Sequence, residues 1–134
     1  MAAAVADYRP ETVADRKIKK DQAGNDVLNL KLIPNPDILA SLGKIKTTHQ
    51  ILVGFALETD DELANAQKKL QSKNADFIVL NSLNDEGAGF GTDTNKTTIL
   101  TAKGEKYPLP LQSKQSAAEA IVSRVLSQSN HDDT

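Results

Sequence analysis

The chain has 134 residues, a formal net charge of −2 at pH 7, 39% hydrophobic and 4% aromatic residues, and no cysteine. The length fits one domain, and the absent thiols exclude a disulfide scaffold, a thiolate zinc site and a cysteine nucleophile. The charge argues against a general nucleic-acid or anionic-membrane binder. Apolar runs are far shorter than the roughly 20 residues that span a bilayer, and no signal peptide is recognised, so we expect a cytoplasmic protein.

The first quarter of the chain predicts two strands around a polar loop. Met1–Asp7 is apolar and ends on an aspartate, which is typical of the last part of a buried strand. Tyr8–Gln22 mixes charges with a proline and predicts a long functional loop. Val27–Ile33 follows a turn sequence and partly alternates apolar and polar residues, so it predicts a half-buried strand that Pro34 ends.

The next segment predicts a short helix followed by a buried strand. Asn35 is a good N-cap before Pro36 at the first helical position, and apolar residues recur at helical spacing as far as Ile45. Gln50–Ala56 is almost wholly apolar and predicts a strand buried on both faces.

A second helix is predicted between two strands. Thr59 and Glu62 match a capping box, and residues 74–76 break the helix. Phe77–Leu80 then predicts a buried strand that ends at residues 81–82. Strand, helix and strand in this order favour a right-handed crossover between parallel strands.

The C-terminal third predicts a hairpin and a final helix. Residues 84–95 are rich in glycine and polar side chains and predict a loop. Thr97–Thr101 and Lys106–Leu111 predict a hairpin, whose second strand is an edge because it contains two prolines. Ser113 is the predicted cap of a helix with an apolar side that reaches Leu126, and residues 127–134 form a predicted frayed tail.

Three features are candidates for chemistry, and each has an alternative interpretation. Lys17 lies in a basic run that either binds an anionic group or is a solvated loop. Lys69 and Lys73 are four residues apart on one helical face, where they either hold a polyanion or complement the helix dipole. Phe55 either belongs to the core or stacks on a base.

Other site patterns are absent or weak. His49 and His131 are isolated and lack the spacing of a histidine zinc site. The chain contains no GxGxxG, GxxxxGK[ST] or GxSxG motif. The glycine-rich residues 87–91 are a weak candidate for holding phosphate, because no clear helix follows them.

Five sequence blocks in one order resemble the phosphopantothenoylcysteine synthetase of bacteria, the ligase half of the bifunctional coenzyme A biosynthesis flavoprotein. They are AAAVADYRP at residues 2–10, KIKK at 17–20, NPDI at 35–38, VGFALET at 53–59 and GFGTDTN at 89–95. The resemblance covers nearly the whole chain.

The resemblance implies a CTP-dependent ligation of 4'-phosphopantothenate with L-cysteine through an acyl-cytidylate, with Mg²⁺ accompanying the nucleotide. It implies Lys17 as the catalytic lysine, which also contacts the nucleotide, and a substrate contact at Ala3. No metal-ligating residues of the protein are predicted. The implied nucleotide contacts also include Asp7, Asn35, Pro36, Asp37, Ile38, Phe55, Lys69 and Lys73.

The resemblance also implies an α/β fold, a Rossmann-like or ribokinase-like three-layer sandwich. The family's glycine-rich turn and first βα units are not in this sequence. We therefore expect residues 1–126 to be the C-terminal portion of the ligase domain, N-terminally truncated and inactive alone. FMN would bind only to the upstream decarboxylase domain that is fused to the ligase in the parent protein. A homodimer is expected through a β-arm at residues 8–33. The alternative function is a non-catalytic nucleotide-binding or dimerisation module.

Overall fold

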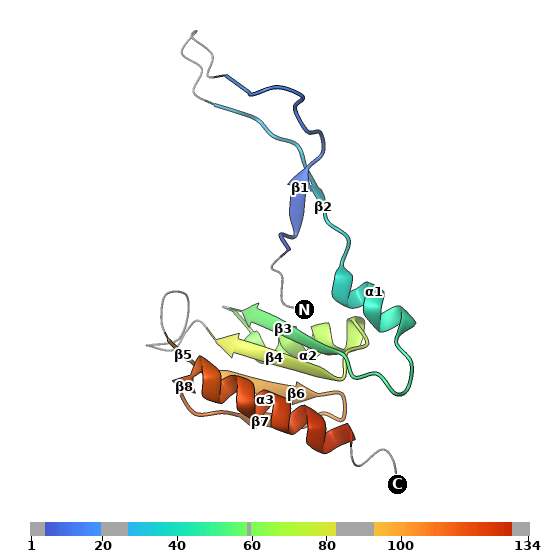
Figure 1. Cartoon of the computed structure of the whole chain (residues 1–134), viewed down its shortest axis with the longest axis vertical. Helices are drawn as coiled ribbons and strands as arrows, with labels where there is room; N and C mark the ends of the chain where they lie inside the picture. Colours follow the sequence, from blue (N-terminus) through green and yellow to red (C-terminus); the bar gives the residue numbers. More distant parts are fainter. Residues whose placement is uncertain (1–4, 20–26, 59, 83–92, 130–134) are drawn as a thin grey trace. The chain divides into compact units, whose positions relative to one another are not determined.

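The computed structural model describes residues 5–19, 27–58, 60–82 and 93–129, which form two compact units divided between Asp37 and Ile38 (Figure 1). The predicted substrate contact Ala3, the capping residue Thr59 and most of the predicted loop at residues 84–95 lie outside the described residues. Among the described helices, none has the length and apolar character needed to cross a bilayer.

The first unit is a two-stranded antiparallel arm. β1 (Tyr8–Pro10) pairs with β2 (Leu32–Pro34), with Arg9 opposite Ile33. The predicted buried strand ending at Asp7 is wrong in its described part, because residues 5–7 are exposed and the strand starts after them. The half-buried strand predicted over Val27–Ile33 is also wrong in extent. No layer packs on the arm within this unit, so its alternating apolar side chains remain exposed.

The second unit is built on a mixed sheet in the order β3-β4-β6-β7 (Figure 1). The strands are β3 (Val53–Glu58), β4 (Phe77–Ser82), β6 (Thr97–Thr101) and β7 (Lys106–Pro108). β3 and β4 are parallel, and the other pairs are antiparallel, which confirms the predicted hairpin and its edge strand. Two short strands, β5 (Thr94–Asn95) and β8 (Gln112–Ser113), pair separately.

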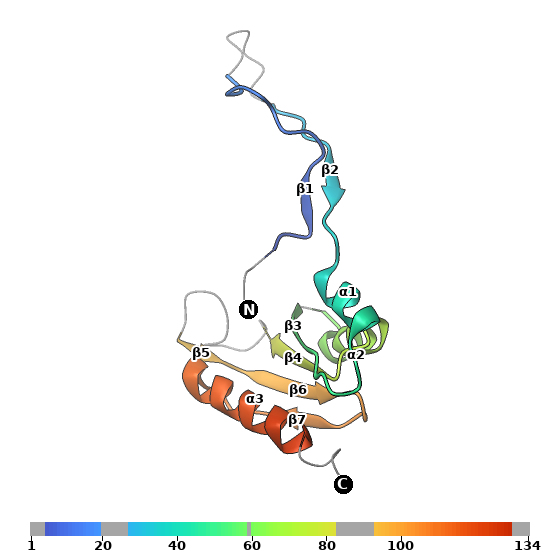
Figure 2. The ribbon, with the colours of Figure 1, turned by 45° about the vertical axis from the view of Figure 1, so that its right-hand side comes forward.

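Helices cover both faces of this sheet. α2 (Glu62–Ser72) packs on one face, and α1 (Ile38–Ile45) places Leu39 against the same core cluster. α3 (Lys114–Ser129) lies on the opposite face (Figures 1 and 2). The α/β class and the three-layer arrangement are therefore confirmed. α3 continues three residues beyond the predicted domain end at Leu126.

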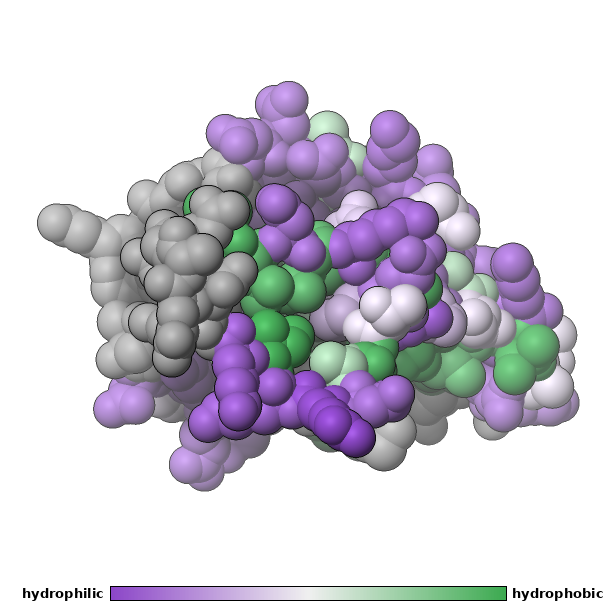
Figure 3. Space-filling model, turned by 90° about the horizontal axis from the view of Figure 1, so that it is seen from above, coloured by the Kyte–Doolittle hydropathy of each residue, from purple (hydrophilic) through white to green (hydrophobic). Residues whose placement is uncertain are grey.

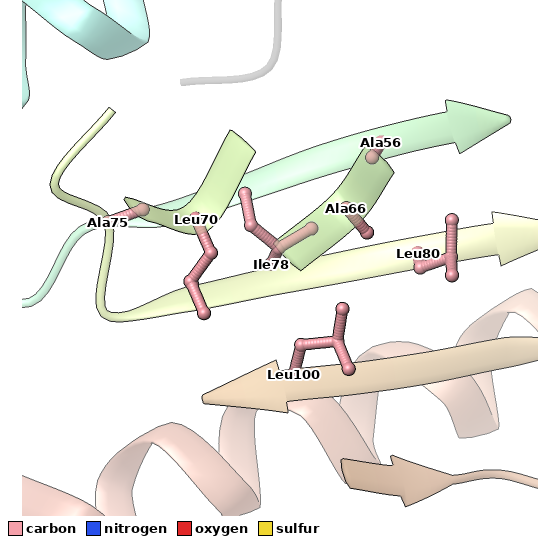
Figure 4. Close-up of a cluster of buried hydrophobic side chains, with 7 residues drawn as sticks. All are labelled: Ala56, Ala66, Leu70, Ala75, Ile78, Leu80 and Leu100. Atoms are coloured by element: carbon pink, nitrogen blue, oxygen red, sulfur yellow. The ribbon is translucent and has the colours of Figure 1, made fainter. Parts of the chain in front are cut away.

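The core between the sheet and α2 is aliphatic, as the low aromatic content requires. Figure 4 shows its members gathered from α2, β3, β4, β6 and the turn between α2 and β4: Ala56, Ala66, Leu70, Ala75, Ile78, Leu80 and Leu100. Gly54 belongs to this close packing, because an added Cβ would lie 2.6 Å from Leu39 Cδ2 and 2.8 Å from Ile78 Cδ1.

Two predicted helix starts are wrong by about one turn or less. α1 begins at Ile38 instead of Pro36, since the Asn35 amide is used by the arm and does not cap the helix. α2 begins at Glu62, after Asp61 in a left-handed conformation (φ 43°) that makes no side-chain capping bond. The N-cap of α2 is therefore Asp61 and not Thr59 as predicted, and the Glu62 carboxylate accepts a hydrogen bond from Ser82 Oγ at 2.9 Å.

The predicted stop of α2 and the cap of α3 are confirmed. Asn74 is left-handed (φ 50°), and its N–H and that of Ala75 bond back to the carbonyls of Gln71 and Leu70, which is a Schellman ending. Ser113 Oγ accepts the Ser116 N–H at 3.1 Å, as an N-cap does.

The strand at Val53–Glu58 is not buried on both faces as predicted. Ala56 is buried under α2, whereas the Phe55 side chain on the other face is 66% exposed. β3 is the first strand of the described sheet, and no described strand or helix covers this part of its second face. Its apolar run therefore has one buried and one exposed side.

Candidate functional site

Asn35 and Asp7 meet at the base of the arm. The Asn35 N–H donates to the Asp7 carbonyl oxygen at 2.8 Å, and Asn35 Nδ2 donates to the Ala6 carbonyl oxygen at 2.6 Å. Arg9 Nη1 donates to Asn35 Oδ1 at 2.9 Å and to the Pro34 carbonyl oxygen at 3.0 Å. The backbone N–H expected at a helix start is thus used within the arm, and Asp7 is exposed.

The other predicted residues of the first unit are exposed. Lys17 lies in a segment without regular secondary structure, with its side chain in solvent. Pro36 and Asp37 connect the arm to α1 and are exposed as well. An exposed lysine on such a segment is able to approach a ligand without a large rearrangement of the core.

In the second unit, Phe55 lines a shallow hollow of about 220 Å³ between the sheet and α3. Its apolar wall comes from α3, and polar side chains stand near the ends of β4 and β5. The remaining lining residues are Asn81, Asn95, Thr97, Lys114, Ala117, Ala118, Ile121 and Val122. Asn81 Oδ1 accepts a hydrogen bond from Thr97 Oγ1 at 2.9 Å, which fixes this amide at the carboxyl end of β4. The hollow can hold a group that is apolar on one side and polar at one end.

Lys69 reaches the carboxyl end of β3. Its Nζ lies 2.6 Å from Glu58 Oε1, and the Lys69 and Glu58 side chains are 46% and 15% exposed. Glu58 Oε1 is buried and has no hydrogen-bond donor of suitable geometry within the described part of the chain. The nearby ammonium is therefore the charge that offsets the burial of this carboxylate.

Lys73 is the C-cap of α2, and its N–H bonds to the Lys69 carbonyl oxygen at 2.9 Å. The two lysines are thus one turn apart, as predicted. Lys73 lies shortly before the amino end of β4, whereas the Lys69 ammonium points back to the carboxyl end of β3.

The predicted site residues divide between the two units. Asp7, Lys17, Asn35, Pro36 and Asp37 belong to the first unit. Ile38, Phe55, Lys69 and Lys73 belong to the second, in which Ile38 opens α1 with its side chain 53% exposed.

Apart from Phe55, the residues around the hollow were not predicted as site residues. Asn81 had a usable signal, because it directly follows a buried strand and such positions gather at the carboxyl edge of parallel strands. Asn95 ends the GFGTDTN block at residues 89–95, which was a signal without an assigned role. Lys114 had none, since the pairing that brings it to this edge is tertiary. Glu58 stood in the VGFALET block at residues 53–59 without an assigned role, and the Lys69 ion pair gives it a defined contact.

Comparison with known proteins identifies the family. The profile of the DNA/pantothenate metabolism flavoprotein C-terminal domain matches residues 1–128. The chain therefore belongs to this family.

Two curated relatives that this chain matches carry different names. A protein called Cysteine/Cysteine sulfinic acid decarboxylase, from an unknown prokaryotic organism, is 51% identical over 94% of this chain and 34% of its own length. The coenzyme A biosynthesis bifunctional protein CoaBC of Bacillus subtilis is 47% identical over 92% of this chain and 29% of its own length. The chain thus spans about a third of the length of these relatives.

Solved structures share the fold. The C-terminal domain of CoaBC is 35% identical with a TM-score of 0.71, and the match covers 98% of this chain and 53% of that one. A Cab2 mutant in complex with phosphopantothenate-cysteine matches at 24% identity with a TM-score of 0.53, over 81% of this chain and 35% of that one. The second likeness shows the fold alone.

Proposed function

We propose that this chain is part of a phosphopantothenate–cysteine ligase that uses CTP in coenzyme A biosynthesis in the cytoplasm. The observation that carries the proposal is the match of 98% of the chain to the C-terminal domain of a coenzyme A biosynthesis protein. Cationic side chains in both units supply the second support, because nucleotidyl transfer depends on positive charge where negative charge develops.

The proposed reaction has two steps. The carboxylate of 4'-phosphopantothenate attacks the α-phosphorus of CTP, and the bond to pyrophosphate breaks to leave an acyl-cytidylate. The amine of L-cysteine then attacks the acyl carbon, loses a proton and displaces CMP. Lys17 is proposed to offset charge on the acyl group in the second step, as an ammonium on an exposed segment can.

Lys69 and Lys73 are proposed to hold the triphosphate. Each ammonium acts as a point charge toward phosphate oxygens. For Lys69 this requires an exchange of partners, since its Nζ now contacts Glu58. A bound triphosphate offers more negative charge than one carboxylate, so the exchange is favourable when the nucleotide arrives.

The remaining nucleotide contacts are proposed from both units. Asp7 and Asn35 have fixed positions in the arm through their mutual hydrogen bond, and the exposed Phe55 ring can stack on a base. The segment from Pro36 to Ile38 would complete the cytidine pocket, and Ala3 would contact the acyl substrate.

Mg²⁺ is proposed to arrive with the nucleotide. No group of three or more His, Asp or Glu residues suited to a metal exists among the described residues. Phosphate oxygens of the nucleotide would be the main Mg²⁺ ligands, together with water. FMN would bind only to a fused decarboxylase domain.

The arm is proposed to pair with a second copy of the chain in a homodimer. Its exposed side chains Val27, Leu28, Leu30 and Leu32 would gain burial there. The alternative proposal is a non-catalytic nucleotide-binding or dimerisation module, for which the exposed apolar side chains of the arm would be the dimer contact.

The catalytic proposal is tested by placing this chain in Bacillus subtilis CoaBC in exchange for the matching segment. In this chimera, Lys17→Gln should allow pyrophosphate release and acyl-cytidylate formation but slow product formation at least tenfold. Single-turnover mass spectrometry follows both species. Lys19→Gln is the matched control and should behave as the parent chimera. Unchanged turnover with cysteine in Lys17→Gln would refute the assigned role.

A further inference from the structure

Glu58 and Lys69 form an ion pair whose two side chains differ in exposure. The Glu58 side chain at the end of β3 is 15% exposed, whereas the Lys69 side chain on α2 is 46% exposed. A lysine carries its charge on a flexible four-carbon stem, so an ammonium that is nearly half in solvent can turn to another partner. The lysine is therefore the member of the pair that can leave.

The surroundings of the Glu58 carboxylate favour the return of the lysine. Glu58 Oε1 is buried and has no hydrogen-bond donor of suitable geometry among the described residues, so the Lys69 ammonium at 2.6 Å is the charge that compensates it. Ser82 lies opposite Glu58 in the parallel ladder, but its hydroxyl donates to Glu62 Oε1 at 2.9 Å. Loss of the ammonium would leave a buried carboxylate uncompensated, which is costly in free energy.

The ion pair between Lys46 and Asp76 has a different organisation. The Lys46 side chain is only 16% exposed, and the Asp76 carboxylate also accepts the Leu52 N–H at 2.7 Å. A mostly buried lysine and a carboxylate with a second partner are features of a permanent structural contact. The Glu58–Lys69 pair differs in its exposed lysine and in its buried oxygen without a hydrogen-bond donor, and both features favour an exchangeable contact.

We propose that Glu58 competes with phosphate oxygens for Lys69 and thereby promotes the release of polyphosphate from the ligase site. This inference rests on the proposed role of Lys69 as a ligand of the triphosphate. When a polyphosphate takes the ammonium, Glu58 loses its compensating charge, and this cost weakens binding. When pyrophosphate leaves after the first step of the proposed reaction, the ammonium returns to Glu58. The carboxylate thus destabilises the bound polyphosphate and favours turnover.

The test measures the binding of inorganic triphosphate and of pyrophosphate to this chain and to its Glu58→Gln variant, by calorimetric titration at one salt concentration. Glutamine has nearly the shape of glutamate and needs no compensating charge, so it frees Lys69 without leaving a cavity. We expect Glu58→Gln to bind both anions at least tenfold more tightly. Because the probes contain no nucleotide, a failure of the proposed CTP specificity or of ligation would not affect the result.

Two comparisons show whether the effect depends on Lys69. The chain has 16 lysine and arginine residues, and Figure 3 shows hydrophilic side chains around the hydrophobic surface on the face seen from above, so a general charge effect needs a control. Glu119→Gln makes the same change of charge at an exposed position of α3 and should alter either affinity less than twofold. In a Lys69→Ala background, Glu58→Gln should lose its effect, because no ammonium remains to be released.

A measurement on the unaltered chain does not depend on the folding of any variant. The carbon-13 signal of the Glu58 carboxyl group should shift as triphosphate is added, because the ammonium leaves it. The proposal is overturned if Glu58→Gln binds triphosphate equally or more weakly, if its effect persists in the Lys69→Ala background, or if the Glu58 signal does not move at saturation. An unchanged triphosphate affinity of Lys69→Ala alone would show that the proposed phosphate role of Lys69 is itself wrong, and the inference would fall with it.

Discussion

At the residue scale, the side chains with the clearest structural roles are polar groups that the sequence does not single out. Asp76 was predicted only as part of a helix break. In the structure its Oδ1 lies 2.7 Å from Lys46 Nζ, and its Oδ2 accepts the Leu52 N–H at 2.7 Å. These partners are 30 and 24 residues away, so no local pattern could have predicted them.

Asp76→Asn should lower the free energy of unfolding by about 2 kcal/mol, because a charge-assisted bond is lost and Lys46 keeps an uncompensated, mostly buried ammonium. Urea unfolding followed by circular dichroism measures the change. Asp15→Asn removes an exposed carboxylate and should have almost no effect. Equal stability of the Asp76 and Asp15 variants would contradict this role.

The lysines of α2 allow a second prediction at this scale. In the Bacillus subtilis CoaBC chimera, the double variant Lys69→Ala, Lys73→Ala should weaken CTP binding at least tenfold, a loss of about 1.4 kcal/mol or more. Calorimetric titration with Mg²⁺ present measures the affinity. Lys68→Ala removes a neighbouring exposed charge from the same helix and should keep most of the affinity. Affinity retained in the double variant would exclude these lysines as triphosphate ligands.

At the element scale, the sequence predicted buried strands well and isolated strands poorly. Phe77–Leu80, the β6–β7 hairpin and α3 were predicted because their patterns match the packing that each receives. The prediction for the arm was wrong because no helix or further strand in its unit covers its alternating apolar side chains. The start of α2 was predicted too early because Asp61, in a left-handed conformation, is the residue that precedes the helix, and local sequence preferences do not predict that conformation for an aspartate.

The contact between α1 and the end of α2 gives a prediction at this scale. Gly43 is buried, and an added Cβ would lie 1.8 Å from the Lys73 carbonyl oxygen. Replacing a helical glycine with alanine normally stabilises by about 1 kcal/mol, but overpacking against backbone costs about 1–3 kcal/mol or more. Gly43→Ala should therefore destabilise the protein, by about 2 kcal/mol.

Thermal or urea unfolding shows whether Gly43→Ala lowers or raises the free energy of unfolding. Ser123→Ala in α3 is the control, because Ser123 is exposed and alanine has the higher helix propensity, so this variant should gain a few tenths of a kcal/mol. A gain in stability for Gly43→Ala would mean that α1 does not pack closely on the Lys73 carbonyl.

At the scale of the whole molecule, the sequence motifs were enough to recognise the family. The exposed surfaces could be identified only from the tertiary structure. The family match over residues 1–128 agrees with the resemblance found in the sequence. The sequence could not show that Phe55 is exposed on β3, the first strand of the described sheet, because VGFALE has the composition of a fully covered strand. Nor could it show the division of the candidate site between two units, since that division depends on contacts far apart along the chain.

The most direct measurement is ligation by the chimera of this chain and Bacillus subtilis CoaBC, supplied with 4'-phosphopantothenate, L-cysteine and Mg²⁺. We predict 4'-phosphopantothenoylcysteine as product when CTP is added, with one pyrophosphate released per product. A folded chimera that forms no product with CTP, while the unaltered CoaBC is active under the same conditions, would contradict the proposed function.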